Sequence, residues 1–167
     1  GVILSPVPMQ YRRAELEPIV RLTGARALLT VGHFKDTEPA LLATTLEPRL
    51  EVLVLGEQAP DGTRAFEPAR FAGAEAAARA GALEAGAAAS ADDILTICWT
   101  SGTEGAPKGL PRSHNHWLAI SWAHFEAAQI RDGDRLLNPF PLVNMAAIGG
   151  CLTSWLRGAG TLLLHHP

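Results

Sequence analysis

The sequence predicts an α/β fold, a layered sheet with flanking helices, on three observations. The first is composition: 47% of the residues are hydrophobic and 19% are charged, which is typical of a globular domain. The second is that short apolar runs rich in Val, Ile and Leu alternate with segments of helical spacing. The third is length, because 167 residues suffice for one domain with a sizeable core and are few for two.

The first half of the chain alternates between strand-like and helix-like segments. Each strand-like run is apolar and is followed within two residues by Gly or Pro, which ends it. We expect buried strands at residues 2–4, 27–31 and 51–55, a helix carrying Ala14, Leu16, Ile19, Val20 and Leu22 that ends at Gly24, and a short helix at 38–46.

Residues 72–91 interrupt this alternation. They contain 12 alanines, three glycines that each cost a helix about 1 kcal/mol, and one large apolar side chain, Leu83. We expect a flexible linker or a frayed helix here, separating two halves of one domain.

The second half begins with another apolar run and predicts the same class of structure. We expect a buried strand at 94–99 and a glycine-rich loop at 101–109 leading to a helix. The helix should have its N-cap at Ser113 and a face formed by Leu118, Trp122 and Phe125. A turn at 131–134, a strand at 135–138, a helix at 145–156 that ends near Gly158 and a strand at 161–164 should follow.

Charge and cysteine usage exclude several classes of protein. The net charge is −3, and only one lysine follows Lys35, so a basic nucleic-acid-binding face is not expected. Cys98 and Cys151 lie in apolar runs without metal-ligand spacing, which predicts free thiols and a cytoplasmic location. We expect no signal peptide, and no apolar run is long enough to span a membrane. The chain starts without Met and ends in a strand-like run, so we expect a fragment of a larger domain, whose exposed strand favours a homo-oligomer.

The glycine-rich loop is the strongest functional signal. Its hydroxyls, its glycines and Lys108 could direct O–H, N–H and ammonium groups at a polyphosphate. A polar strand–helix connection without a ligand is the alternative interpretation. The common P-loop is excluded by spacing, because Pro107 and Gly109 stand where that motif needs Gly and Ser or Thr.

Residues 99–109 closely resemble the phosphate-binding signature of adenylate-forming enzymes, an aromatic residue followed by T-S-G-T-[T/S]-G-x-P-K-G. Only Glu104 departs from it. Residues 139–148 are similar to that superfamily's P-L-F-H-x-x-G-[LI] segment, with Pro141 and Leu142 matching and Val143, Asn144 and Ala147 differing. The opening S-P-V-P turn and the T-G-A-R-A-L-L run at 23–29 also resemble its N-terminal region.

The resemblance implies part of the N-terminal domain of an acyl-CoA-synthetase-like ligase of fatty acid metabolism. Such an enzyme uses ATP, Mg²⁺ and coenzyme A to convert a carboxylic acid to an acyl-adenylate and then to a thioester. A carrier-protein-loading adenylation domain and an inactive nucleotide-binding homologue are the alternatives. The implied nucleotide-binding residues are Thr100, Ser101, Gly102, Thr103, Glu104, Gly105 and Lys108, and Asn144 is the implied acid-binding residue. The catalytic residues are expected outside residues 1–167. Residues 1–167 alone should therefore not catalyse the reaction.

Two departures bear on this expectation. Glu104 puts a carboxylate where a hydroxyl is usual, and a unit charge 4–8 Å from phosphate would oppose binding by roughly 2–4 kcal/mol unless it faces solvent or reaches Mg²⁺. Asn144 replaces a histidine and can donate a hydrogen bond but carries no charge.

The remaining polar and aromatic residues predict structural roles. His114 and His116 are expected at a helix terminus rather than on a metal, and residues 92 and 93 as a solvated lead into a strand. Trp117 and Trp122 are five residues apart, so at least one of them should pack in the core, with a substrate tunnel as the alternative for the other.

Overall fold

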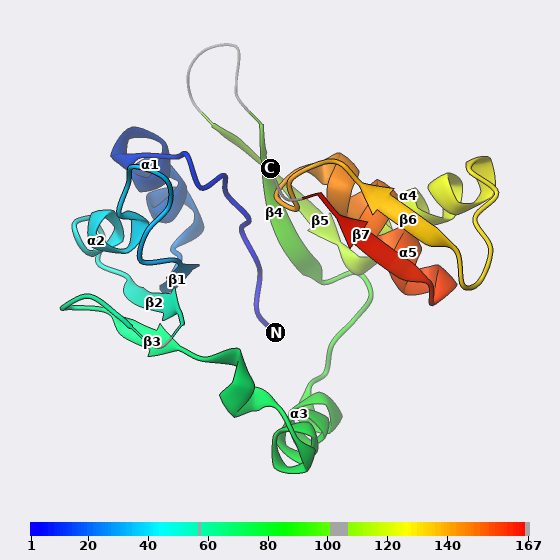
Figure 1. Cartoon of the computed structure of the whole chain (residues 1–167), viewed down its shortest axis with the longest axis horizontal. Coiled ribbons are helices and arrows are strands. Elements are labelled where there is room, and N and C mark those ends of the chain that lie inside the picture. Colours follow the sequence, from blue (N-terminus) through cyan, green and yellow to red (C-terminus); the bar gives the residue numbers. More distant parts are fainter. Residues whose placement is uncertain (57, 101–106, 166–167) are drawn as a thin grey trace. The chain divides into compact units, whose positions relative to one another are not determined.

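The computed structural model describes residues 1–56, 58–100 and 107–165, whose helices and strands are labelled in Figure 1. They form two compact units, one made of Gly1–Pro8 with Ala89–Pro167 and the other of Met9–Ala88. The second junction between the units falls within residues 72–91, where the sequence predicts a separation. The α/β class expected from the sequence is confirmed in both units.

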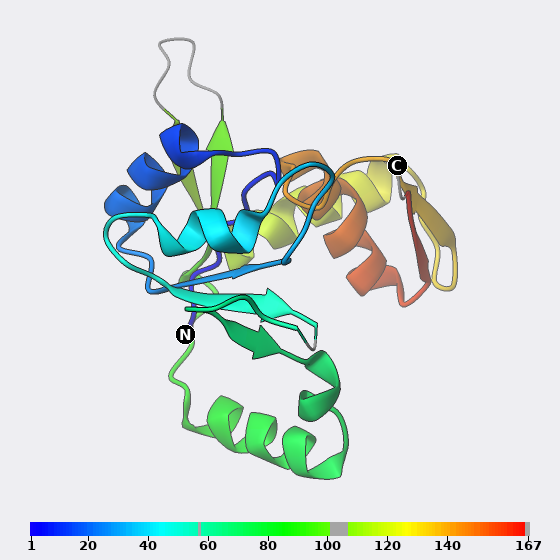
Figure 2. The ribbon, with the colours of Figure 1, turned by 60° about the vertical axis from the view of Figure 1, so that its left-hand side comes forward.

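The unit Met9–Ala88 is built on a three-stranded sheet of order β1-β2-β3 in which all strands are parallel. Helix α2 lies over this sheet (Figure 2). Its elements in chain order are α1 (Arg13–Thr23), β1 (Ala27–Thr30), α2 (Pro39–Thr44), β2 (Glu51–Leu55), β3 (Arg64–Phe66), a 3-10 turn η1 (Pro68–Phe71) and α3 (Ala74–Gly86).

Helix α1 confirms the helical spacing of the sequence. Its buried face consists of Leu16, Ile19 and Val20. Gly24 ends the helix with a left-handed backbone, φ 60°, and its N–H donates to the carbonyl of Val20 over 3.0 Å. A residue with a Cβ is strained in this conformation, which explains why glycine is the stop signal.

The strands of this unit are half-buried, whereas the sequence predicted burial on both faces. In β2, Val52 and Val54 are buried while Glu51 and Leu55 are exposed, and in β1 the side chain of Leu29 is 54% exposed. This alternation is what a sheet covered by a helix on one face produces, because successive side chains point to opposite faces.

Helix α3 occupies most of the alanine-rich segment. None of its residues is buried, and its ion pair between Arg79 and Glu75, 2.8 Å long, is exposed at both ends. Exposed pairs of this kind contribute little to stability. The segment is therefore a helix without a packed face, and its flexibility stays a prediction.

The unit made of Gly1–Pro8 and Ala89–Pro167 contains two small sheets. Strands β4 (Ile94–Thr100) and β5 (Lys108–Ser113) form an antiparallel hairpin, and β6 (Arg135–Asn138) and β7 (Thr161–Leu164) pair in parallel (Figure 1). The unit's helical elements are α4 (His114–Ala127), a π-helical segment η2 (Ala147–Leu152) and α5 (Thr153–Gly158).

The opening residues pack against β4, although they form no regular strand. Leu4 makes a single parallel bridge to Thr96, with its N–H donating to Leu95 at 2.9 Å and its carbonyl accepting from Ile97 at 2.8 Å. The expectation of a buried strand at residues 2–4 is therefore wrong. Only one residue pairs, and the side chains of Val2, Ile3 and Leu4 are exposed.

The core beneath the hairpin joins β4 to α4 and η2. Cys98, Trp117 and Ile148 are buried together, with Leu95 and Met145 packed against them. Helix α4 therefore faces the core with Trp117 and Ser121, not with Leu118, Trp122 and Phe125, the set that the sequence singled out. Those three residues follow helical spacing but lie on a more exposed side.

Candidate functional site

Thr100 and Lys108 stand opposite each other where the predicted phosphate loop leaves the hairpin. They are the last pair of the β4–β5 ladder. Because directly opposed residues of an antiparallel pair project from the same face, the hydroxyl of Thr100 and the ammonium of Lys108 leave the hairpin on one side. Thr100 is half-buried and Lys108 is exposed. The structure thus brings together the first and last of the residues predicted to bind the nucleotide.

The next pair of the ladder, Trp99 and Gly109, is in close contact. A Cβ placed on Gly109 would lie 3.0 Å from Cζ3 and Cη2 of Trp99 and 2.9 Å from Cγ2 of Ile97. Such contacts are shorter than packed carbon atoms tolerate. Position 109 therefore requires glycine for steric reasons, because a larger residue would collide with the indole of Trp99, which packs over β5.

Ser5 contacts the same indole from the opening segment. The Nε1–H of Trp99 donates to Oγ of Ser5 over 2.7 Å, a short hydrogen bond between residues 94 positions apart. Both residues are half-buried. The base of the loop is thus connected to the first residues of the chain.

The N-terminus of α4 lies at the opposite end of the hairpin from the loop. Ser113, its N-cap, pairs with Ile94 at the start of β4 and is five residues from Lys108, roughly 17 Å along an extended strand. The expectation of a strand–helix loop is therefore wrong, because β5 intervenes. The backbone amides of α4 are consequently not available to a phosphate at the loop.

The N-cap itself is confirmed. Oγ of Ser113 accepts from the N–H of His116 at 3.3 Å, and Nδ1 of His116 accepts from the N–H of Ser113 at 3.1 Å. This reciprocal arrangement satisfies two backbone donors at the helix end. His116 is thus a helix-terminal residue, as the sequence predicted, and His114 follows the cap directly on an exposed position.

Asn144, the predicted acid-binding residue, precedes the helix that continues into η2. Its Oδ1 accepts from the N–H of Ala146 at 2.8 Å, and its backbone carbonyl accepts from Ile148 at 3.0 Å. The side chain is exposed and acts as a helix cap. Contact with an acid would use its Nδ2, the remaining donor of the amide, so this role stays a prediction.

The other predicted nucleotide-binding residues lie outside the described part of the chain. They are Ser101, Gly102, Thr103, Glu104 and Gly105.

Two hollows of about 330 and 490 Å³ lie in the unit Met9–Ala88, against β3, η1 and α3. Their arginines are paired with neighbouring carboxylates: Arg64 with Glu51 at 2.8 Å, Arg70 with Glu67 at 2.9 Å and Arg79 with Glu75 at 2.8 Å. The charges are therefore balanced locally, which does not favour a charged ligand.

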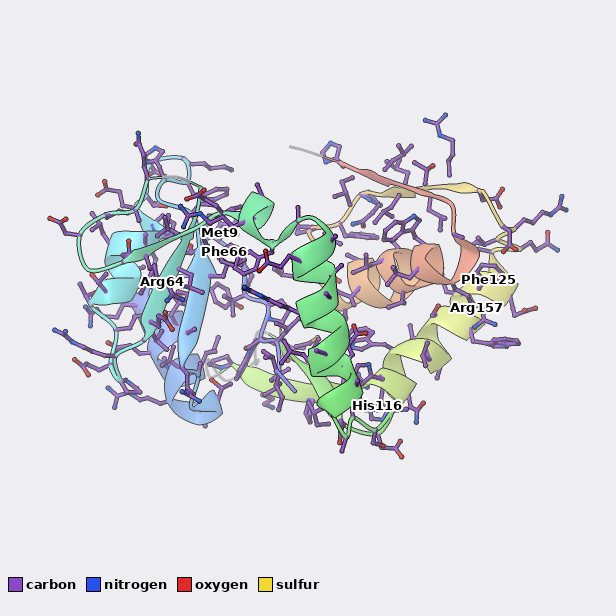
Figure 3. The ribbon with its side chains drawn as sticks, turned by 90° about the horizontal axis from the view of Figure 1, so that it is seen from below. Met9, Arg64, Phe66, His116, Phe125 and Arg157 are labelled. Atoms are coloured by element: carbon purple, nitrogen blue, oxygen red, sulfur yellow. The ribbon has the colours of Figure 1, made fainter. Side chains whose placement is uncertain are left out.

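The two tryptophans of α4 have different surroundings. Trp117 is 2% exposed and belongs to the core, which confirms that at least one of the pair is buried. Trp122 is 53% exposed, and the guanidinium of Arg157 lies 4.1 Å from its ring centre and 5.5 Å from that of Phe125. Figure 3 shows Arg157 beside Phe125. This cation–π arrangement occupies one ring face of Trp122 at the surface.

The cysteines are free thiols, as predicted, with Cys98 buried and Cys151 half-buried. Burial raises the pKa of the Cys151 thiol, which makes it a poorer nucleophile at neutral pH. Within residues 1–56, 58–100 and 107–165, no three His, Cys, Asp or Glu side chains are grouped to hold a metal ion. Across the same residues, the helices are too short or too polar to cross a membrane.

Two residues of this unit have contacts that the sequence does not predict. Ser5 lies in the S-P-V-P turn, and nothing local indicates its contact with a residue 94 positions later. The sequence makes no prediction for Arg112, which follows the expected loop at 101–109. It lies on β5, where its Nε is buried without a hydrogen-bond partner among the described residues and its Nη2 lies 3.9 Å from Sδ of Met145.

Comparison with known proteins finds a family whose members are similar to this chain over its whole length. A family model described as AMP-binding enzyme matches residues 1–167. The medium-chain fatty-acid–CoA ligase of Escherichia coli K12 is 26% identical over 168 residues, which cover 98% of this chain and 29% of that protein. The long-chain-fatty-acid–CoA ligase FadD13 of Mycobacterium tuberculosis H37Rv is 44% identical over 69 residues, 40% of this chain and 13% of that protein.

A solved structure has the same fold. The anthranilate CoA ligase AuaEII, crystallised with anthranoyl-AMP, superposes with a TM-score of 0.74 at 22% identity over 99% of this chain and 31% of that chain. At this identity the likeness shows the fold alone. The chain spans less than a third of the length of these ligases.

Proposed function

This chain belongs to the AMP-binding enzyme family, and we propose that the protein containing it is an AMP-forming acid–thiol ligase. A carboxylate oxygen of the acid attacks the α-phosphorus of ATP, the bond to the bridging oxygen of the β-phosphate breaks, and pyrophosphate leaves. The sulfur of coenzyme A, which loses its proton, then attacks the acyl carbon, the bond from that carbon to the phosphate oxygen breaks, and acyl-CoA and AMP are released. The relatives named as CoA ligases favour coenzyme A over a carrier protein as the acceptor.

The observation that carries this proposal is the pairing of Thr100 with Lys108 at the base of the loop. A hydroxyl donor and a cation leave the hairpin on one side, where departing pyrophosphate needs hydrogen bonds and neutralisation of charge. We propose that the residues binding the β- and γ-phosphates are Thr100, Ser101, Gly102, Thr103, Glu104, Gly105 and Lys108, and that Asn144 contacts the acid.

Mg²⁺ fits this scheme as part of the nucleotide. Mg²⁺ keeps several waters and is ordinarily held by substrate phosphates with one or two carboxylates. Among the described residues, no three His, Cys, Asp or Glu side chains are grouped to hold a metal ion. We propose that the ion arrives on the phosphates of ATP and that Lys108 adds a positive charge beside them.

The size of the Lys108 contribution follows from its exposure. Two unit charges 4 Å apart attract by about 1 kcal/mol in water and about 4 kcal/mol at an effective dielectric constant of 20. Lys108 is exposed, so its contribution should lie between these limits. Removing it is expected to weaken ATP binding by more than about fivefold and less than about a thousandfold.

The test is acid-dependent exchange of pyrophosphate into ATP by the full-length protein with a panel of carboxylic acids. Lys108→Ala should reduce the exchange, and Lys35→Ala, the same change at the only other lysine, should not. Addition of coenzyme A should then produce AMP and acyl-CoA in equal amounts. Unchanged exchange in Lys108→Ala would remove this residue from the mechanism. A wild-type protein that exchanges no pyrophosphate with any acid would overturn the proposed function.

A further inference from the structure

We propose that Ser5 is a positioning residue for ATP: its hydrogen bond to Trp99 fixes the strand ends from which Thr100 and Lys108 project. The assignment rests on the proposed function, because it concerns the same hairpin. In this assignment Ser5 does not contact the nucleotide; it acts through the indole of Trp99, to which it is hydrogen-bonded.

The backbone holds Ser5 in place. Its neighbour Leu4 is bound to β4 by two hydrogen bonds, to Leu95 at 2.9 Å and from Ile97 at 2.8 Å. Pro6 follows, and a residue before proline is restricted to extended conformations. The hydroxyl of Ser5 is thus presented to β4 by a segment with little freedom.

The indole of Trp99 is held at two places by two different segments. At its five-membered ring, Nε1 donates to Oγ of Ser5 over 2.7 Å. At its six-membered ring, Cζ3 and Cη2 lie against Gly109, leaving no room for a Cβ there. Trp99 therefore connects three segments: the opening residues, β4 and β5.

Loss of either attachment would act on the nucleotide-binding pair. Thr100 follows Trp99 directly, and Lys108 precedes Gly109 directly, so both are one residue from the indole contact. An indole released at Nε1 can rotate, and it then no longer fixes the spacing of the two strand ends. Displacements of about 1 Å at a reacting group can cost a hundredfold in rate, so a loosened strand end is expected to be measurable.

The test compares four single variants and one double variant, Ser5→Ala with Trp99→Phe, of the full-length protein in the acid-dependent formation of AMP. Ser5→Ala removes the acceptor, Ser5→Thr keeps it, and Trp99→Phe keeps an aromatic ring without the donor. Trp155→Phe is the matched control, because its Nε1 makes an equivalent hydrogen bond of 2.8 Å to the carbonyl of Gly160 in the same unit. The readouts are kcat/KM for ATP, KM for the acid and the unfolding temperature.

We expect Ser5→Ala to lower kcat/KM for ATP by about three- to tenfold, the range of one net hydrogen bond, while KM for the acid changes less than about twofold. Ser5→Thr should restore the wild-type value. Adding Ser5→Ala to Trp99→Phe should cause no further loss, because both remove the same bond.

Three results would overturn the assignment. They are an unchanged kcat/KM for ATP in Ser5→Ala, an equal loss in Trp155→Phe, which would indicate general loosening, or additive losses in the double variant. In each case an active wild-type protein leaves the proposed function intact. A wild-type protein that forms no AMP with any acid overturns the proposed function, and this assignment falls with it.

Discussion

Trp117 donates its indole N–H to the hydroxyl of Thr96 over 2.9 Å, and both side chains are buried. The hydrogen bond joins α4 to the centre of β4, the strand that leads into the predicted phosphate loop. It also satisfies two polar groups that water does not reach. The position of the helix on the hairpin is thus fixed by one specific contact in addition to apolar packing.

Thr96→Val should therefore destabilise the protein although it preserves the shape of the side chain. The indole N–H of Trp117 would remain buried without an acceptor, which costs about 1–3 kcal/mol. Thr96→Ser, which keeps the hydroxyl, is the control. Urea unfolding followed by circular dichroism measures both. A valine variant more stable than the serine variant would contradict this account.

Gly149→Ala should be destabilising because α4 and η2 are in close contact. A Cβ at this position would lie 2.7 Å from Cγ2 of Ile120 and 3.1 Å from Cζ3 of Trp117, and overpacking typically costs about 1–3 kcal/mol. The same change in the exposed helix α3, Gly81→Ala, meets no atom within 4 Å and should stabilise by about 0.5–1 kcal/mol. Thermal unfolding of the two variants should shift in opposite directions, and a common direction would refute the packing argument.

Ser113→Ala should lower stability without weakening ATP binding. Loss of the N-cap hydroxyl costs about 1 kcal/mol. The cap lies at the opposite end of the hairpin from Lys108, so KM for ATP should remain within twofold of wild type. Steady-state kinetics and thermal unfolding of the variant separate the two effects. A marked rise in KM for ATP would show that the N-terminus of α4 takes part in phosphate binding.

Cys151 should make the protein less stable at alkaline pH. Burial raises the pKa of its thiol in the folded protein, so the unfolded chain loses this proton first. The contribution of the buried thiol to the free energy of unfolding is fully present below the pKa of the unfolded chain, about 8.5. It is lost as the pH rises through the pKa of the folded protein. Cys151→Ala removes it. The free energy of unfolding, measured in urea from pH 7 to 10, should fall less steeply in the variant, and parallel curves would exclude the effect.

The elements that local pattern defines were predicted closely. Strand β2 spans Glu51–Leu55 as expected, β6 spans Arg135–Asn138 and β7 spans Thr161–Leu164. In each, an apolar run is bounded by residues that break strands. Helix α1 was equally clear, because Gly24 provides both the stop and the left-handed backbone.

Elements that depend on a distant partner were not predicted. Strand β5 contains Gly109 and Pro111, both poor strand residues, and it forms because β4 supplies the pairing edge. Missing it led to the wrong expectation that a helix terminus follows the loop. The contact of Ser5 with Trp99 has no local signal either, since a lone serine before proline is common in turns.

The packing of Gly1–Pro8 with residues after Ala89 has a consequence for the order of folding during synthesis. Ribosomes add about 5–20 residues per second, so Leu4 waits roughly 5–20 s before Ile97, its hydrogen-bond partner, has been made. The residues of the unit Met9–Ala88 are complete earlier and pair only among themselves in its sheet. The nascent chain can therefore form that unit while residues 1–8 are still unpaired, and the Ser5–Trp99 contact can close only after Trp99 has been made.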